Sequence, residues 1–229
     1  MLSNDQTVFT RDDRETLHKI MLARRDMRHF LANSKVDKEV LDRIMIAAHT
    51  APSVGLMQPW RFINILDTSL REKIASQVDD EITKTANEMD HRKADFLKLK
   101  LEGIRDCAVL IAVVQAPDDG TILGRRTLPQ EMALCSTACA IQNLWLAARA
   151  ENIGMGWVSL FDPKYLAKLL HCPENALPIA LLCLGPVKKF YVEPMLVETG
   201  WRNEKTLDSV LFNDQWLDDD GSPKFQNKQ

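Results

Sequence analysis

Three arginines and one aspartate lie within five residues, in the segment Arg24-Arg25-Asp26-Met27-Arg28. Guanidinium groups this close repel one another unless an anion lies among them, and the planar donor fork of arginine suits phosphate oxygens. The same positive charges favour the ionised form of Asp26, which makes it a candidate proton acceptor beside a bound phosphate ester. The alternative is a helix end with solvated charges, and a short RRxxR pattern alone does not decide between the two.

Three further motifs have residue types that suit a binding site. They are the loop Ala51–Trp60 (APSVGLMQPW), the segment Gly154–Ser159 (GMGWVS) and the triplet Gly200-Trp201-Arg202. Ser53 either caps a turn or binds a ligand, Ser159 is either a satisfied core hydroxyl or a site residue, and Arg202 reaches either a phosphate or a carboxylate. The sequence has no G-x-G-x-x-G after a strand, no Walker-type lysine loop and no G-x-S-x-G elbow. It therefore gives no support for dinucleotide or ATP binding by those routes.

Composition narrows the class of protein. The 229 residues are 45% hydrophobic and 27% charged, which predicts a packed core. A net charge of -3 with no basic stripe argues against nucleic acid as a partner. No apolar run reaches the length of a membrane span and residues 1–13 are too polar for a secretory signal, so we expect a cytoplasmic protein. Five cysteines without a C-x-x-C, and histidines without an H-E-x-x-H pair, predict neither a disulfide framework nor a metal site.

Periodicity predicts the elements that position these motifs. Helices are expected over residues 12–23, 37–48 and 129–151, and after the N-cap pair Asp162-Pro163; strands are expected over 61–66, 107–114, 157–160 and 178–184. Helices that alternate with about four strands, without a linker or repeat, predict one α+β domain over residues 1–229. Its central sheet would be flanked by helices.

Two segments do not have the residue pattern of elements in the hydrophobic core. Residues 69–103 are charged with a thin apolar stripe, which predicts either a lid over the body or a plain surface helix. The tail, residues 187–229, has little periodicity but still carries aromatic residues such as Trp201 and Trp216. Apolar residues on an irregular segment need a surface to cover, so we expect an extended arm that wraps a partner subunit.

Together and in this order, the four motifs resemble those of the FMN-binding nitroreductase superfamily, from about residue 15 to about residue 210. The resemblance implies a homodimer with flavin at its interface and exchanged C-terminal arms, around a central mixed sheet. It also implies that FMN is bound by residues of the four motifs and by one leucine near the end of the candidate lid. These residues are Arg24, Arg25, Asp26, Met27, Arg28, Ser53, Leu101, Ser159 and Arg202.

Within the superfamily, the chain is more similar to the flavin-fragmenting 5,6-dimethylbenzimidazole synthases than to ordinary nitroreductases. Asp26 stands where ordinary members have a small residue, Leu56 replaces an asparagine, and Ser159 stands at the second essential position of this subgroup. The resemblance implies that Asp26 and Ser159 are catalytic, that reduced FMN (FMNH2) is consumed as a substrate together with O2, and that a separate flavin reductase supplies it. The alternatives are an NAD(P)H-dependent nitroreductase or flavin reductase that keeps its FMN, and a non-enzymatic flavin-binding module.

Overall fold

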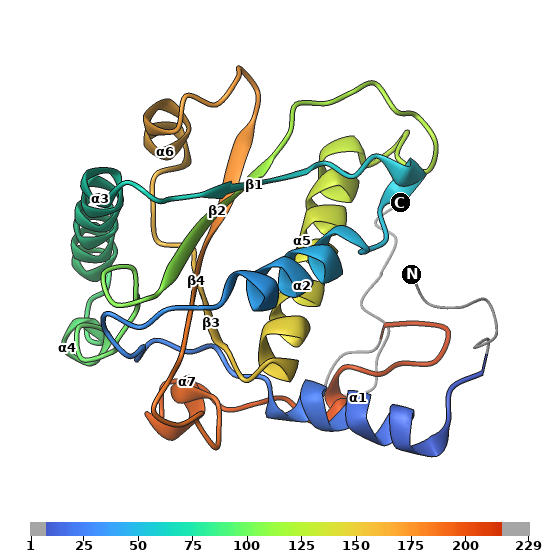
Figure 1. Ribbon diagram of the computed structural model, residues 1–229, viewed down its shortest axis with the longest axis horizontal. Coiled ribbons are helices and arrows are strands. Elements are labelled where there is room, and N and C mark those ends of the chain that lie inside the picture. The colour runs from blue at the N-terminus through green and yellow to red at the C-terminus, as the bar shows by residue number, and fades with distance from the viewer. Residues whose placement is uncertain (1–7, 217–229) are drawn as a thin grey trace, which may run out of the picture. The chain divides into compact units, whose positions relative to one another are not determined.

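The computed structural model describes residues 8–216, and the chain divides into two units, residues 1–192 and residues 193–229. The first unit contains α1 (Arg11–Ala23), α2 (Lys38–His49), η1 (Val54–Leu56), β1 (Trp60–Asn64), α3 (Thr68–Asn87), α4 (Lys93–Phe96), β2 (Val109–Gln115), α5 (Pro129–Ala150), β3 (Gly154–Val158), α6 (Pro163–Leu169) and β4 (Leu177–Gly185) (Figure 1). The second contains α7 (Met195–Glu198) and η2 (Leu207–Ser209).

The four strands form one sheet in the order β1-β2-β4-β3. Every pair of neighbouring strands is antiparallel. The parallel component of the expected mixed sheet is a single bridge between Asp26 and Met155, at the outer edge of β3. The central strands β2 and β4 are buried over most of their length, which explains why their sequences are nearly continuous apolar runs.

Helices cover both faces of the sheet, as an α+β fold requires (Figure 1). On one face, α2 and α5 pack through residues such as Ile44 and Ile141 against Leu182 of β4. On the other face, α3 and α6 pack through Ile74 and Leu166 against Leu181. Successive residues of a strand point to opposite faces, so β4 contributes to both halves of the core.

The segment expected as a lid has two parts with different structures. Ile74, Ala75 and Val78 of α3 are at most 1% exposed, and Arg71 Nη1 donates to the carbonyl of Cys107 at 2.8 Å. Residues 68–87 are therefore a surface helix whose buried face packs on the core, which is the second of the two interpretations of this segment. Part of its apolar stripe is alanine, which makes the stripe look thin in the sequence. The lid interpretation now applies only to residues 88–103, where it stays a prediction.

The strand expected over residues 157–160 is instead β3, Gly154–Val158. Its two glycines read as turn residues but lie within the strand, where the backbone of Met27 crosses close to it. The Met27 N–H donates to the Met155 carbonyl at 2.8 Å, and a Cβ on Gly156 would lie 2.1 Å from the Met27 carbonyl oxygen. A close approach of backbone, and not a turn, requires glycine here.

We expect Gly156→Ala to lower the free energy of unfolding by about 3 kcal/mol or more, because the new methyl group would force the arginine segment away from β3. Urea denaturation followed by circular dichroism measures the loss. Gly120→Ala is the control: its Cβ would meet no atom within 4 Å, so only its positive φ of 78° costs energy, about 1–2 kcal/mol. Equal losses in the two variants would contradict the close-approach argument.

Candidate functional site

The arginine segment continues the sheet beyond β3 by using side chains in place of backbone groups. The Trp157 N–H donates to Asp26 Oδ1 at 2.9 Å, and Arg28 Nη2 donates to the Trp157 carbonyl at 2.7 Å. Both backbone groups of Trp157 on the outer edge of β3 are thus bonded to charged side chains. The geometry of the sheet therefore fixes where the Asp26 carboxylate and the Arg28 guanidinium lie.

Asp26 and Arg28 also form an ion pair, with Arg28 Nη2 at 2.5 Å from Asp26 Oδ2. The Arg28 side chain is 9% exposed and the Asp26 side chain 40% exposed, so the carboxylate is the member of the pair that a ligand can reach. Burial raises the pKa of Asp26 above its ordinary value, although the charges of Arg28 and Arg24 and the Trp157 N–H act in the opposite direction. The sequence had indicated that the arginines would dominate. Instead, partial removal from water does, and it gives Asp26 a stronger affinity for a proton than an exposed carboxylate has.

The structure uses Arg25 and Arg28 differently from the expectation that each binds a ligand. Arg25 Nη1 donates to the carbonyls of Leu22 and Arg24, and Arg25 Nη2 donates to the carbonyl of Val192, each at 2.7 Å. Arg25 therefore tethers backbone. Arg28 holds Asp26, while its Nε and Nη1 are buried without a partner in the described chain.

Of the three arginines in the segment, Arg24 is the one that is available to bind an anion. Its guanidinium carbon lies 4.8 Å from the centroid of the Trp145 ring, a cation–π distance that holds the group without neutralising its charge. Within residues 8–216 it pairs with no carboxylate. Met27, also expected at the site, is fully buried beneath the segment, so its side chain is part of the core.

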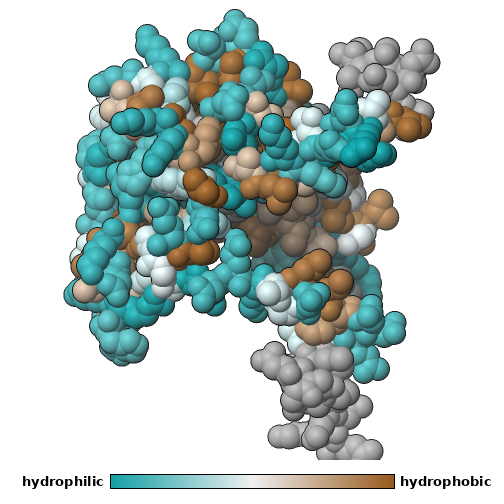
Figure 2. Space-filling model, turned by 90° about the horizontal axis from the view of Figure 1, so that it is seen from below, coloured by the Kyte–Doolittle hydropathy of each residue, from teal (hydrophilic) through white to brown (hydrophobic). Residues whose placement is uncertain are grey.

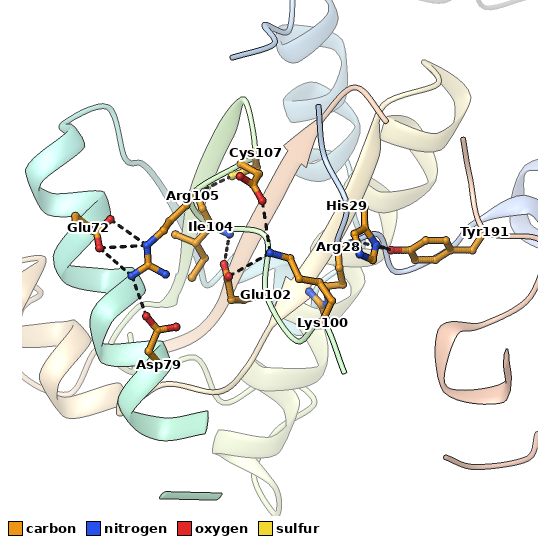
Figure 3. A network of polar contacts seen from close by, with 11 residues as sticks. Arg28, His29, Glu72, Asp79, Lys100, Glu102, Ile104, Arg105, Cys107 and Tyr191 are labelled. Atoms are coloured by element: carbon orange, nitrogen blue, oxygen red, sulfur yellow. Dashed lines mark hydrogen bonds and ion pairs between the residues drawn. The ribbon is translucent and has the colours of Figure 1, made fainter. Parts of the chain in front are cut away.

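A strap formed by Phe190, Tyr191 and Val192 crosses the arginine segment, and the sequence analysis missed it. The Tyr191 hydroxyl lies 2.5 Å from His29 Nδ1 and accepts the Arg28 N–H at 3.3 Å. His29 and Tyr191 lie beside Arg28 in Figure 3. With the bond from Arg25 to Val192, these contacts hold the segment in addition to its bonds with β3.

Ser159 is exposed and follows directly after β3. It is two residues beyond Trp157, so it lies about 7 Å further along the chain direction of that strand. Within residues 8–216 its hydroxyl makes no hydrogen bond, whereas its carbonyl accepts the Phe161 N–H at 3.1 Å. The structure therefore places Asp26 and Ser159, the two candidate catalytic residues, at the same end of the same edge strand.

Leu101 is half-buried in a loop that lies against the arginine segment. A Cβ on Gly103, two residues later, would lie 2.9 Å from the Arg28 carbonyl oxygen and 2.6 Å from Phe30 Cε2. Lys100 of the same loop is drawn in front of Arg28 in Figure 3. Leu101 thus belongs to a loop that packs on Arg28 and Phe30, although no contact of its side chain defines a role.

Ser53 caps a turn, as one of the two interpretations of the sequence held. Its Oγ accepts the Gln58 N–H at 3.1 Å, and the next residue, Val54, donates its N–H to Ser136 Oγ at 3.2 Å. The Ser53 hydroxyl hydrogen stays available to a ligand, because within residues 8–216 it donates to no acceptor. The described contacts do not bring the Ser53 loop together with the arginine segment in one chain.

Arg202 lies in the second unit, where its N–H donates to the Leu196 carbonyl at 3.1 Å and its side chain is exposed. Its contact with a phosphate stays a prediction.

The predicted site residues do not line the cavities described next. Three cavities of the described residues have volumes of about 550, 760 and 410 Å³, and none is lined by a predicted site residue. Among residues 8–216, no cluster of three or more histidines, cysteines and carboxylates could hold a metal ion. No helix in that range is long and apolar enough to cross a membrane.

Comparison with known proteins gives consistent results. Residues 21–186 match the family described as the nitroreductase family. A 5,6-dimethylbenzimidazole synthase from Rhodospirillum rubrum is 36% identical over 198 residues, which are 84% of this chain and 92% of that protein. The structure of nitroreductase A from Vibrio parahaemolyticus superposes with a TM-score of 0.67 at 18% identity, over 89% of this chain and 77% of that one. Oxidized iodotyrosine deiodinase bound to FMN and 3-iodo-L-tyrosine superposes with a TM-score of 0.66 at 20% identity, over 83% of this chain and 97% of that one.

We expect Arg28→Met to raise the pKa of Asp26 further, because Arg28 is the largest influence that lowers it, and Arg24→Met to raise it less. Carbon-13 NMR of the Asp26 carboxyl carbon measures both pKa values.

The raised pKa belongs to the folded state, so Asp26 contributes fully to stability at a pH below its pKa in the unfolded chain. This contribution is lost as the pH rises through the pKa of Asp26 in the folded protein. In Arg28→Met, the loss of folding stability with rising pH should therefore extend to a higher pH. An unchanged or lowered pKa in that variant would contradict this account of the pair.

Proposed function

Because the chain belongs to the nitroreductase family, we propose that the outer edge of β3 and the arginine segment form a site for reduced FMN. The chain is an enzyme that fragments reduced FMN with O2 to 5,6-dimethylbenzimidazole, the lower ligand of cobalamin, and D-erythrose 4-phosphate. The observation that carries this function is Asp26, held by Trp157 and Arg28 at the end of the strand that Ser159 follows. A 5,6-dimethylbenzimidazole synthase with 36% identity over most of the chain supports it.

The residues at this edge fit such a ligand. Arg24 offers a guanidinium that is held over Trp145 and suits a phosphate group. Arg28 is 9% exposed, so in this proposal it holds the Asp26 carboxylate in place and does not itself contact the phosphate. Gly156 keeps the surface of β3 free of a side chain where the segment crosses it. When bound, reduced FMN supplies the electrons that O2 accepts.

Asp26 is the proposed base for protons on the ribityl side of the flavin. Oδ1 accepts one bond from Trp157 and Oδ2 accepts one from Arg28, which leaves each oxygen a lone pair for a substrate proton. Its raised pKa makes proton removal more favourable than it would be with an ordinary carboxylate. Because both bonds come from one buried arginine and one strand, the carboxylate cannot rotate away from its position.

Ser159 is proposed to orient the flavin ring by hydrogen bonding. Its hydroxyl is exposed and makes no hydrogen bond within residues 8–216, so it can bind a ligand without losing another partner. Leu101, from the loop beside Arg28, would contact the ring, and residues 88–103 would close over the site and exclude water. A separate flavin reductase would supply the reduced flavin.

A homodimer with exchanged C-terminal arms would complete the site. Ser53 is not brought to the arginine segment within one chain, and a second protomer can supply its loop. α1 has no buried residue, with Leu17 and Met21 nearly half exposed, and hydrophobic side chains lie among hydrophilic ones on the face in Figure 2. β1 is an edge of the sheet, and an uncovered edge strand invites pairing. The part of the expected arm that follows the strap at Val192 and carries Arg202 would then reach the partner's flavin phosphate; residues 217–229 of that arm lie outside the described residues.

The proposed reaction is tested by incubating the purified protein with enzymatically reduced FMN in air and separating the products by chromatography. We expect 5,6-dimethylbenzimidazole to form in proportion to the flavin lost. Reoxidation to intact FMN, together with rapid NADPH oxidation in the presence of a nitroaromatic, would instead identify an NAD(P)H-dependent nitroreductase.

Asp26→Asn should keep FMN bound but lower the rate of product formation by about 10²- to 10⁴-fold, the usual contribution of a general base. Binding is measured by the change in flavin fluorescence, and product by chromatography. Asp79→Asn is the matched control, because Asp79 also pairs with an arginine, Arg105 at 2.9 Å, but on α3. Normal turnover in Asp26→Asn would remove the role assigned to this carboxylate.

A further inference from the structure

Arg125 is a buried arginine outside the site described above, at 4% exposure. Its Nε donates to the Thr121 carbonyl at 2.5 Å, and its Nη1 donates to the Pro129 carbonyl at 3.4 Å. Its Nη2 pairs with the carboxylates of Asp118 and Asp119. A buried guanidinium is stable only when its donors are bonded, so these four partners and Arg125 form one connected unit. That unit closes the loop between β2 and α5.

This loop packs directly on the loop that carries Ser53. A Cβ on Gly55 would lie 2.7 Å from Thr121 Cγ2 and 3.1 Å from the Leu123 carbonyl oxygen. In return, a Cβ on Gly124 would lie 2.8 Å from Val54 Cγ1. Each of the two loops therefore has a glycine at the point where the other loop packs most closely against it. Thr121, which Arg125 holds by its carbonyl, is therefore also the residue that contacts Gly55.

The Ser53 loop needs support from outside, because its backbone is strained. Gly55, Leu56 and Gln58 all have positive φ, at 58°, 53° and 42°. Leucine and glutamine pay an energy cost in that region, and such conformations persist only where the surroundings enforce them. The bond from Gln58 to Ser53 lies within the loop. Support from outside comes from Ser136 Oγ, which accepts the Val54 N–H at 3.2 Å, from Arg61, which donates to the Gln58 carbonyl at 3.1 Å, and from the contacts on Gly55 and Val54.

We propose that Arg125 is a positioning residue for the flavin site. By fixing Thr121 and the chain around it, Arg125 holds the Ser53–Gln58 backbone in its strained form and so sets where the Ser53 hydroxyl lies. This inference rests on the proposed function, in which Ser53 contacts the flavin. It assigns no contact between Arg125 and the flavin itself.

The first test needs no flavin. In Arg125→Lys, one ammonium group cannot reach all four partners, so we expect the Val54 and Gln58 amide hydrogens to exchange with solvent about tenfold faster, measured by hydrogen–deuterium exchange NMR. The control is Arg43→Lys, because Arg43 also makes a two-point ion pair, with Glu151 at 2.7 and 2.9 Å, but between α2 and the residue that follows α5. It should leave both amides unchanged. Equal exchange rates in wild type and Arg125→Lys overturn the proposal.

The second test measures function in the same variants. Arg125→Lys should lower the yield of 5,6-dimethylbenzimidazole per reduced FMN consumed by about tenfold, because misplaced contacts cost rate more than binding. The dissociation constant of FMN should change by less than about threefold, since the phosphate contacts lie elsewhere. Faster exchange with an unchanged yield in an active wild type also overturns the proposal.

The two proposals fail in distinguishable ways. If the wild type forms no product but the two amides still exchange faster in Arg125→Lys, the reaction is wrong while the positioning role stands. Asp118→Asn covers the case in which Arg125→Lys does not fold, because Asp118 is 59% exposed and its loss leaves the core intact. It should speed exchange of the same two amides by a smaller factor, and no change there contradicts the role of the ion pair.

Discussion

The structure depends on one interaction, the docking of the arginine segment on the outer edge of β3. An edge strand exposes backbone donors and acceptors that must find partners. Here Met27 supplies a backbone donor to Met155, while Asp26 and Arg28 supply an acceptor and a donor to Trp157. The edge is closed with charged side chains, so the same bonds that complete the sheet also build the site.

This arrangement explains why Asp26 combines a fixed position with an unusual proton affinity. A carboxylate at the end of a flexible side chain on the surface would be solvated and weakly basic. Asp26 instead takes the place of a backbone carbonyl in the sheet, which removes part of its hydration and raises its pKa. Arg28 limits that rise, and Arg28 in turn keeps its place through the Trp157 carbonyl and the strap at Tyr191. The fixed position of the Asp26 carboxylate and its raised pKa thus have a common cause, the docking of Asp26 on the edge of the sheet.

The elements whose signals are local were predictable from the sequence. The Asp162 N-cap with Pro163 marks α6, and the apolar runs mark β2 and β4. The errors arise where a distant contact overrides a local signal. The glycines of β3 look like turn residues because the sequence does not show that Met27 crosses there. The bond from Arg25 to the Val192 carbonyl could not be predicted, because the two residues are 167 positions apart in the sequence. Burial of Asp26 is a property of the folded chain, so the direction of its pKa shift could not be predicted from the sequence.

The proposed walls of the site belong to different parts of the fold, and this difference bears on how the enzyme uses the flavin. The wall that holds Asp26 is part of a sheet whose central strands are buried on both faces. Of the remaining proposed walls, the Leu101 loop and the C-terminal arm are the closing segments and do not belong to the sheet, whereas the Ser53 loop of a second protomer is held by the contacts of the Arg125 unit. A resident cofactor gains from walls that never open, whereas a flavin consumed in each turnover has to enter and its fragments have to leave. A rigid catalytic edge with separate closing segments meets both needs, because the closing segments can move without displacing the carboxylate that removes the proton.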